Sequence, residues 1–406
     1  MERAYEYRIY PNAEQRAQIE RTFGCRRWVW NRCLAERIAL YDEVGKAPSG
    51  FDQMKELPRL KQQEDTSWLG EADSVALVQA IRDLDRAYAN FFRRLKKGGR
   101  PGFPRFKSKR TGRQTYRTGG AVSIVDSKHV RLPKLGSVKA RVSRMPEGRI
   151  LSATVKRVPS GKYFVVLCCA DCPEPKMPPG PIDMMGVDVG VRCLLARSDG
   201  VLITNPKGLR KAEKRLAREQ RRLSRKEKGS ANREKQRRRV ATVHERVANR
   251  RKDALHKATT DAVRESQAIA VEDLKVAPFL RNTGEAREIP RHAERRIHAA
   301  FADASMGELV RQVEYKCEWY GRGFVKVDPA GTSETCSRCG HVQDMPLSRQ
   351  VYRCPECGLA LDRDVNAAVN IAREGRRILE GTVGHTGTAS PELANACGAG
   401  IRPALP

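Results

Sequence analysis

The sequence predicts a chain of several domains in which helical, β and mixed α/β regions follow one another. At 406 residues the chain is long for one domain, so two or three domains are expected. Helical periodicity dominates the first quarter, short alternating runs of apolar and polar residues follow, and the C-terminal half alternates buried-strand patterns with helical ones. We therefore expect a helical lobe, a small β domain and an α/β domain.

The N-terminal region begins with a short strand and continues as helices. Residues 4–10 (AYEYRIY) alternate like a strand. Asn12 then has the position of a helix N-cap, with Gln15 completing a capping box. Helical periodicity extends to about residue 43 and returns over about 74–97, and we interpret 45–72 as a connection. The predicted boundaries are 1–11 for the first strand and 12–113 for the helical lobe.

Residues 114–175 have the pattern of a small β domain. Their alternating runs are separated by turn signals at Asp126-Ser127, Glu147-Gly148 and Ser160-Gly161, which favours an antiparallel sheet or a small barrel. Residues 172–183 contain five prolines, and this density predicts a linker, which we place at 176–183.

The chain is strongly basic, and its surplus charge is clustered. Lys and Arg number 78 against 48 Asp and Glu, giving a net charge of +30 and a pI near 10.0. Residues 207–252 hold 20 cations and 5 acids, and residues 93–117 hold 11 cations and no acid. A solubilising surface spreads its charge, whereas a surface that neutralises phosphates concentrates it. The sequence therefore predicts a nucleic-acid partner.

The two basic segments differ in predicted conformation. Residues 207–255 have the composition of a long helix or helical hairpin with a break at Gly229-Ser230, whereas KKGGRPGFPRFKSKR is a loop. In that loop Phe103 and Phe106 either stack on bases or anchor the loop to a core. The candidate nucleic-acid-binding residues are Arg100, Arg105, Lys107, Lys109, Arg221, Arg222, Arg237, Arg238, Arg239, Arg250 and Arg251.

Several other functional classes are disfavoured. No apolar run reaches the ~18 residues that span a bilayer, and the opening MERAYEYRIYPN lacks the apolar core of a signal peptide. We expect a cytoplasmic protein without a membrane partner, large enough to act as a monomer. The sequence has no Walker loop for ATP and no histidine grouping typical of a histidine-based nuclease or zinc protease.

After the linker, the predicted elements follow the order of an RNase H-like fold. A buried strand with Asp188 is followed by a hairpin, the basic helical region and a second apolar strand ending in Glu272-Asp273. A helical stretch at about 294–320, the strand FVKV and a helix opened by Asp362-Arg363-Asp364 complete the series. We place this nuclease-like domain at 184–332, with its last helix at 361–380.

Three carboxylates in this series are candidates for a catalytic metal site. A carboxylate in or at the end of an apolar strand is costly unless a cation meets it. Asp188, Glu272 and Asp364 offer the oxygen ligands that Mg²⁺ and Mn²⁺ prefer, and a pair of such ions can clamp a phosphodiester. Singly, each acid has a simpler explanation as a turn, strand-end or capping residue, and Asp362 is as good a cap as Asp364 is a ligand. Their order in the fold favours the joint site.

Four cysteines give the most specific local signal. Two residues lie between Cys336 and Cys339 and two between Cys354 and Cys357, and 14 residues separate the two pairs. This spacing, with Gly after each pair, matches a four-thiolate Zn²⁺ ribbon, which we place at 333–360. Two disulfides are the less favoured alternative in an intracellular protein. Four thiolates leave no open position, so this zinc would be structural. We interpret Cys169 and Cys172 as ordinary thiols.

Together these motifs resemble the TnpB (OrfB) family, transposon-encoded relatives of type V CRISPR effector nucleases. In the C-terminal half the resemblance rests on GVDVG, AVEDLK, TSETCSRCGHVQ, LSRQVYRCPECG and DRDVNAAVNI. Near the N-terminus it rests on YRIYPNAEQ and RRWVWNRCL, and in the middle on the two basic segments. It covers nearly the whole chain, except residues 381–406, which we expect to form a disordered tail.

The resemblance implies an RNA-guided DNA endonuclease. Its guide RNA would come from the transposon end, and it would cut double-stranded DNA beside a short adjacent motif, in association with a bacterial or archaeal nucleoid. Asp188, Glu272 and Asp364 would form a RuvC-type triad that binds a pair of Mg²⁺ ions, or Mn²⁺ in their place, and Asp362 would cap the helix. Residues 12–113 would be the recognition lobe, and residues 114–175 with the first strand the β-barrel wedge domain.

Two other functions remain open. One is a nuclease-silent, RNA-guided DNA-binding regulator, although the three acids are all present. The other is a transposase that performs strand transfer with the same acids, because RNase H-like folds support both reactions.

Overall fold

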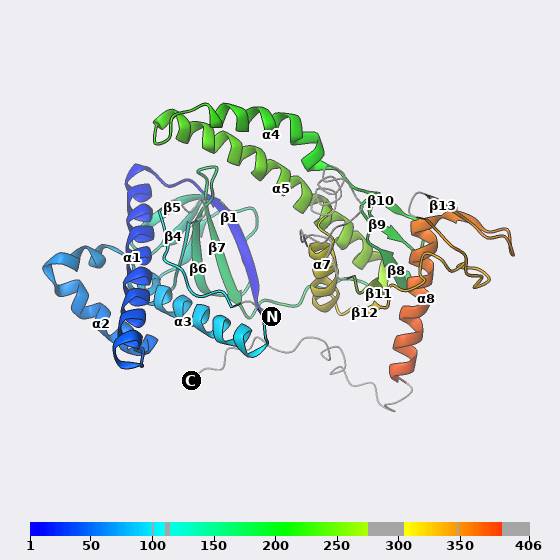
Figure 1. The fold of residues 1–406 in the computed structure, drawn as a ribbon, viewed down its shortest axis with the longest axis horizontal. Helices are drawn as coiled ribbons and strands as arrows, with labels where there is room; N and C mark the ends of the chain where they lie inside the picture. The colour runs from blue at the N-terminus through cyan, green and yellow to red at the C-terminus, as the bar shows by residue number, and fades with distance from the viewer. Residues whose placement is uncertain (100, 110–113, 275–303, 347–348, 384–406) are drawn as a thin grey trace. The chain divides into compact units, whose positions relative to one another are not determined.

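The computed structural model describes residues 1–99, 101–109, 114–274, 304–346 and 349–383. The chain divides into two compact units, which Figure 1 shows as a ribbon. The first comprises Met1–Pro173 with Arg237–Thr242, and the second Glu174–Gln236 with Val243–Pro406. Within the described ranges, no helix is both long and apolar enough to cross a membrane.

The first unit opens with β1 (Arg3–Ile9) and the long helix α1 (Ala13–Val44). The predicted capping box is confirmed: the Gln15 N–H donates to Asn12 Oδ1 at 2.8 Å, and the Asn12 N–H donates to Gln15 Oε1 at 3.1 Å. Helix α3 (Ser74–Lys96) packs against α1 around a core that includes Leu34 and Ile81.

The segment 45–72 is more helical than the sequence analysis expected. It contains α2 (Gly50–Gln62) and the 3₁₀ helix η1 (Glu64–Glu71), so its interpretation as a plain connection was wrong. Pro58 does not end α2, because Leu57 and Leu60 on either side are buried against the α1–α3 core. A capping box at the start of α2, formed by Ser49 and Asp52, was the signal that was missed.

Seven antiparallel strands form the sheet of the first unit. Their order is β2-β6-β7-β1-β5-β4-β3, and β1 therefore joins the sheet between β7 and β5, as expected. Closure of this sheet into a barrel stays a prediction, since β2 and β3 stand at the two ends of the order. The bounds are β2 (Gln114–Thr118), β3 (Ser123–Asp126), β4 (His129–Leu132), β5 (Gly136–Arg141), β6 (Arg149–Arg157) and β7 (Tyr163–Ala170).

Apolar side chains from one face of this sheet pack against α1. Tyr7, Ile9 and Leu167 are almost fully buried, and Ile19 and Phe23 of α1 belong to the same core. Cys169 and Cys172 are free thiols within this core, in agreement with their interpretation as ordinary packing residues.

A mixed five-stranded sheet is the framework of the second unit. Its order is β10-β9-β8-β11-β12, with β8, β11 and β12 parallel and the β9–β10 hairpin antiparallel. The order of elements along the chain agrees with the prediction. The bounds are β8 (Ile182–Asp188), β9 (Cys193–Arg197), β10 (Leu202–Thr204), β11 (Ser266–Glu272) and β12 (Gly323–Val327).

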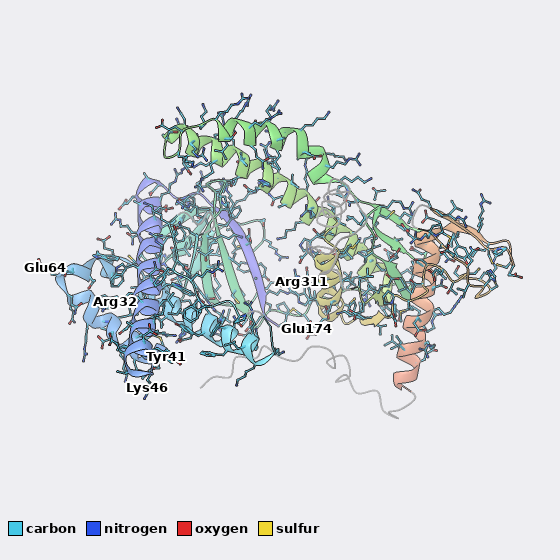
Figure 2. All side chains as sticks on the ribbon, viewed as in Figure 1. Arg32, Tyr41, Lys46, Glu64, Glu174 and Arg311 are labelled. Atoms are coloured by element: carbon cyan, nitrogen blue, oxygen red, sulfur yellow. The ribbon has the colours of Figure 1, made fainter. Side chains whose placement is uncertain are left out.

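The basic region between β10 and β11 is a helical hairpin, as predicted. Helix α4 (Gly208–Ser224) and helix α5 (Ala231–Glu265) are separated at Gly229, whose φ is +93°, and Ser230 caps α5 by accepting the Arg233 N–H at 3.1 Å. Figure 2 shows nitrogen-tipped side chains projecting along both helices.

Two helices complete the second unit. Helix α7 (Met306–Trp319) falls within the predicted helical stretch at 294–320, of which 294–303 lies outside the described residues. Helix α8 (Arg363–Val383) continues three residues beyond the predicted end at 380. Gly381–Val383 are thus helical where a disordered tail was expected, and the rest of that tail, 384–406, lies outside the described residues.

Helix α8 lies directly on the sheet at two glycines. A Cβ added to Gly186 of β8 would stand 1.9 Å from the Ala368 carbonyl oxygen, and one added to Gly375 of α8 would stand 2.4 Å from the Ala270 Cβ. Ile371 and Ala372 of α8 are buried against Met184 and Ala270. The two glycines permit this close approach, which places the first turn of α8 beside the carboxyl end of β8.

Candidate active site and metal centre

The fold brings the three candidate acids to one edge of the sheet. Asp188 is the last residue of β8 and Glu272 the last of β11, and these strands run parallel with Val187 opposite Val271. The two carboxylates therefore emerge at the same edge. Asp364 lies in the first turn of α8, the helix packed on these strands.

The acids are close enough to perturb one another electrostatically. Burial and the negative charges of Glu272 and Asp364 raise the pKa of Asp188 to about 8, although Arg363 opposes this. Burial also raises the pKa of Glu272, against the effect of a hydrogen bond that Thr332 Oγ1 donates to Glu272 Oε1 at 2.5 Å. Carboxylates whose negative charges raise the pKa of a neighbouring carboxyl group, as Glu272 and Asp364 do for Asp188, are a suitable donor set for a divalent cation, because the cation removes the repulsion.

An arginine that the sequence analysis missed joins two acids of this edge. Arg192 Nη2 donates to both carboxylate oxygens of Asp362, at 2.7 and 2.9 Å, and to Asp364 Oδ2 at 2.7 Å. Arg192 Nε donates to the same Asp364 oxygen at 3.1 Å. The hydrogen bonds that Arg192 donates to Asp362 and Asp364 raise the pKa of Arg192, which stays charged. Only its position four residues after Asp188 hinted at this role.

Asp362 has the capping role that was expected of it. Its Oδ1 accepts the Asp364 N–H at 2.9 Å, which satisfies a free N–H of the first turn of α8. Asp362 thus fixes the backbone of Asp364, and Arg192 fixes one of its carboxylate oxygens.

The four predicted cysteine ligands converge. Cys336, Cys339, Cys354 and Cys357 have sulfur atoms that all lie within 4.8 Å of one another. The Cys336–Cys357 and Cys339–Cys354 sulfur separations are 3.6 and 3.5 Å. Tetrahedral zinc with Zn–S bonds of about 2.3 Å requires separations of about 3.8 Å, so this cluster could bind a zinc ion.

Electrostatics in the cluster also fit a cation. Burial raises the pKa of the Cys336 thiol, but hydrogen bonds from the backbone N–H groups of Cys339 and Arg338 outweigh it and hold the pKa at about 6. Hydrogen bonds with the other three thiols instead raise the pKa of Cys339 to about 12, so one thiolate in the cluster opposes the next until a cation is bound. A low thiol pKa favours the thiolate that binds metal.

Two asparagines of the α8 motif attach the ribbon to the helix. Asn366 Nδ2 donates to the Thr335 carbonyl at 2.8 Å and its Oδ1 accepts the Ser337 N–H at 2.9 Å. Asn370 Nδ2 donates to the Thr332 and Thr335 carbonyls at 2.9 and 2.7 Å. The ribbon strands β13 (Val351–Arg353) and β14 (Ala360–Asp362) then lead directly into α8. No role for these asparagines was predicted from the sequence.

The described part of the basic loop is anchored to α1. Trp30 Nε1 donates to the Arg105 carbonyl at 3.0 Å, and Asn31 makes hydrogen bonds with both backbone groups of Lys107 at 2.7 and 3.0 Å. The Lys107 ammonium lies 3.2 Å from the centre of the Trp30 ring, and burial lowers its pKa to about 8. Arg100 lies outside the described residues.

Both loop aromatics and most of the hairpin cations are exposed. Phe103 is 45% exposed but makes edge contacts with Tyr88 and Phe91, which supports an anchoring role, and Phe106 is 58% exposed. Arg251 is half-buried, and the other candidate cations of the hairpin are exposed: Arg221, Arg222, Arg237, Arg238, Arg239 and Arg250.

Three family models match segments of the chain. One described as "Probable transposase" (OrfB_IS605) matches residues 167–283, and one described as "Cas12f1-like, TNB domain" matches 307–371. A third, described as a helix-turn-helix domain, matches 1–46, which fold here as β1 and the uninterrupted helix α1.

Full-length relatives and a solved structure extend these matches. The chain is 39% identical over 408 residues to a "Putative RNA-guided DNA endonuclease" of Streptomyces pristinaespiralis, covering 99% of this chain and 92% of that one. It is 34% identical over 382 residues to InsQ of Escherichia coli K12, which bears the same description, covering 93% of each. Its fold is similar to that in a structure of a Cas12f1–sgRNA–target DNA complex, with a TM-score of 0.51 at 15% identity, over 92% of this chain and 98% of that one. The resemblance found in the sequence is thus confirmed, and the chain belongs to the TnpB (OrfB) family.

Proposed function

We propose that this protein is a metal-dependent, RNA-guided DNA endonuclease encoded by a transposon. The observation that carries the proposal is the meeting of Asp188, Glu272 and Asp364 at one edge of the sheet, where burial and mutual repulsion raise the pKa of Asp188 to about 8. The description of the relatives as RNA-guided DNA endonucleases supports the reaction and the guide.

The topology of the second unit supports a RuvC-type, RNase H-like domain. Numbered in the order β8, β9, β10, β11, β12, the strands are arranged 3-2-1-4-5, with the hairpin at one side and two parallel strands at the other. The acids then occupy the ends of the first and fourth strands and the start of the last helix. In the same scheme the helices α1–α3 form a recognition lobe, and the seven-stranded sheet forms a wedge domain.

Each acid has a specific role in this proposal. Asp188 would hold two divalent ions, while Glu272 and Asp364 would each hold one. A pair of divalent ions bound in this way can clamp both the attacking and the leaving oxygen of a phosphodiester. Mg²⁺ or Mn²⁺ bound there would polarise the phosphodiester and lower the pKa of the attacking water.

Other residues of the site act by positioning. Thr332 orients Glu272 through its 2.5 Å hydrogen bond. Arg192 holds Asp364 Oδ2, and Asp362 accepts hydrogen bonds from Arg192 and from the Asp364 backbone N–H, while Asp364 Oδ1 remains available as a metal ligand. Asn366 and Asn370 keep the zinc ribbon against the same helix.

The basic surfaces are proposed to bind the guide RNA and its duplex with target DNA. Exposed cations of the α4–α5 hairpin would contact phosphates, while base pairing with the guide would read the target beside a short adjacent motif. The chain is large enough to do this as a monomer.

The first test needs no assumed target. The protein is expressed with its native flanking DNA, purified at moderate salt, and the RNA that remains bound is sequenced. One dominant RNA that begins near the 3′ end of the gene supports the proposal and supplies the guide for a substrate. Cleavage of matched DNA should then need Mg²⁺ or Mn²⁺ and be lost in Asp188→Ala while RNA binding is kept. A mixture of cellular RNAs without a dominant species contradicts the guided function.

Strand transfer is the second candidate, because one matching family model is described as a transposase. The reaction product separates the two functions: a joined transposon end indicates transfer, and a free double-strand break indicates a nuclease. A nuclease-silent regulator would bind guided DNA and leave it intact with either metal.

A further inference from the structure

The first unit contains a cavity of about 270 Å³ where β1 ends. It is lined by part of the YRIYP motif, including Arg8 and Tyr10, by Arg16 of α1, and by Arg157 and Lys162 of the β6–β7 hairpin. Arg238, from the part of α5 that groups with this unit, completes the basic lining. Neither the active site nor the basic loop accounts for this motif.

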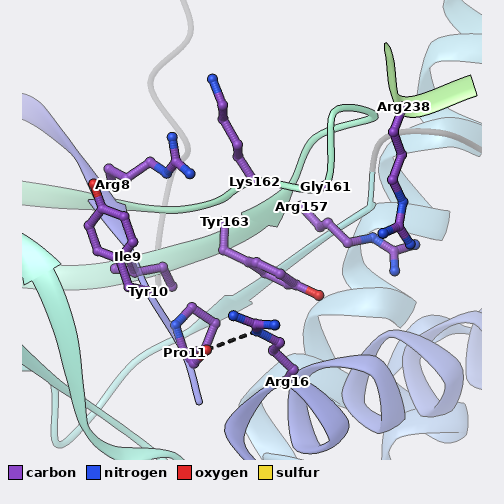
Figure 3. Close-up of a pocket in the computed structure, with 10 residues that line it drawn as sticks. All are labelled: Arg8, Ile9, Tyr10, Pro11, Arg16, Arg157, Gly161, Lys162, Tyr163 and Arg238. Carbon is purple, nitrogen blue, oxygen red and sulfur yellow. Dashed lines mark hydrogen bonds between the residues drawn. The ribbon is translucent and has the colours of Figure 1, made fainter. Parts of the chain in front are cut away.

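The lining of the cavity contains five cations and no acid. Arg157 is paired with Glu20, outside the lining, at 2.6 Å. Arg8 and Arg16 make no ion pair within the described residues: Arg16 Nε donates to the Pro11 carbonyl at 2.9 Å, and Arg8 Nε is buried without a partner. Figure 3 shows Arg8 and Lys162 on one side of the Tyr163 ring, with Arg157 and Arg238 extending toward each other on the other side. The positive charges that line the cavity repel one another, and a bound anion would relieve this repulsion.

An exposed aromatic ring lies beside these cations. Tyr10 is 45% exposed, and the Arg8 guanidinium lies 5.1 Å from the centre of its ring. The Tyr10 N–H donates to the Lys139 carbonyl at 2.7 Å, which fixes the backbone that presents the ring. A cation next to an exposed ring is the combination that binds the phosphate and the base of one nucleotide. The volume is slightly below the ~300–1,000 Å³ of small-ligand sites, so it suits one nucleotide and excludes a duplex.

We propose that this pocket binds one nucleotide of the guide RNA in a single-stranded segment. The phosphate contacts Arg8, Arg16 and Lys162, and the base stacks on Tyr10. That the bound nucleotide belongs to guide RNA rests on the proposed function, because a displaced single strand of DNA offers the same phosphate and base chemistry. The pocket itself depends only on the charges and the ring.

Two pairs of variants test the ring and the charges separately. Tyr10→Ala removes the stacking surface, and Tyr10→Phe keeps it. The double variant Arg16→Gln/Lys162→Gln removes two cations from the pocket, and Lys128→Gln/Arg131→Gln removes two exposed cations from the β3–β4 region of the same unit. Each full-length protein is stripped of nucleic acid. Its affinity is then measured against salt for the co-purifying guide RNA and for a single-stranded DNA of the same sequence.

Tyr10→Ala should weaken RNA binding by roughly 5-fold or more, as loss of one stacked base does, and Tyr10→Phe should match the wild type. The pocket double variant should lower the slope of log affinity against log salt by about 0.7 to 1.4, for one or two phosphates, while the control double variant leaves it unchanged. Equal thermal midpoints exclude unfolding as the cause.

The affinities for RNA and for DNA decide whether the pocket binds RNA, binds DNA or binds neither. If the pocket variants match their controls for RNA and DNA, the pocket assignment is overturned, and guided cleavage by the wild type is unaffected. A loss confined to DNA overturns the RNA assignment in favour of a DNA strand. If the wild type retains no discrete RNA, the guided function fails, and a generic single-stranded RNA is used as the probe in place of the guide. A loss of affinity for that RNA in Tyr10→Ala would still support the pocket.

Discussion

The packing of α8 on β8 predicts that a single methyl group at Gly186 disables the active site. In Gly186→Ala the new Cβ would meet the Ala368 carbonyl oxygen at 1.9 Å and the Ala372 nitrogen at 2.5 Å, whereas ordinary contact begins at 3.4 Å. Helix and strand must therefore separate locally by about 1.5 Å. Overpacking of this kind costs about 1–3 kcal/mol of stability.

The same displacement separates the candidate acids. Gly186 lies two residues before Asp188, and Ala368 lies one helical turn after Asp364. Since a misplacement of 1 Å can cost about 100-fold in rate, we expect metal-dependent cleavage to fall by about 100-fold or more. Binding of RNA and zinc should persist, because the basic hairpin and the four thiols are not part of this contact.

Gly307→Ala is the matched control. Gly307 lies in α7 of the same unit, has no atom within 4 Å of an added Cβ, and does not have a positive φ. Its replacement should leave cleavage unchanged and alter stability by no more than about 1 kcal/mol, in the stabilising direction. The assay is guide-directed DNA cleavage with the thermal midpoint and zinc content of each variant. Wild-type cleavage and an unchanged midpoint in Gly186→Ala would refute the reasoning.

Three further predictions concern zinc, pH and salt. Cys336→Ser should lower bound zinc from one ion per chain, measured by elemental analysis, whereas Cys168→Ser, half-buried in β7, should not. Burial lowers the pKa of Lys316 to about 8, well below that of a lysine in the unfolded chain, so on raising the pH the folded protein loses this proton before the unfolded chain does. The free energy of unfolding of the wild type, measured by denaturant titration relative to that of Lys316→Met, should therefore rise between pH 8 and pH 10. A difference between the two proteins that does not change with pH would contradict this. A third variant neutralises three exposed cations of α5, namely Arg237, Arg238 and Arg239. It should reduce the slope of log RNA affinity against log salt by about 2–3, and an unchanged slope would exclude these residues as phosphate contacts.

Features set by neighbouring residues could be predicted from the sequence. The capping box at Asn12, the break at Gly229-Ser230 and the order of strands and helices after the linker follow from local periodicity and turn chemistry. The convergence of the four cysteine sulfurs was predictable because two short spacings place each pair of sulfurs on one turn, and the structure needed only to bring the pairs together. Local reasoning failed at α2, where burial of leucines outweighs the proline between them.

The sequence by itself determined which groups are candidates for the chemistry: three acids, four thiols and two clusters of cations. Only the tertiary structure decided how those groups are held. Arg192 meets Asp364 across 172 positions of the chain, and Thr332 meets Glu272 across 60, so no periodicity could reveal either contact. Gly186 owes its role to the backbone of α8, and Arg8 and Lys162 line the same cavity because β1 enters the sheet beside β7. Local patterns encode elements and donor types, whereas charge pairing and close packing depend on which distant elements the fold places side by side.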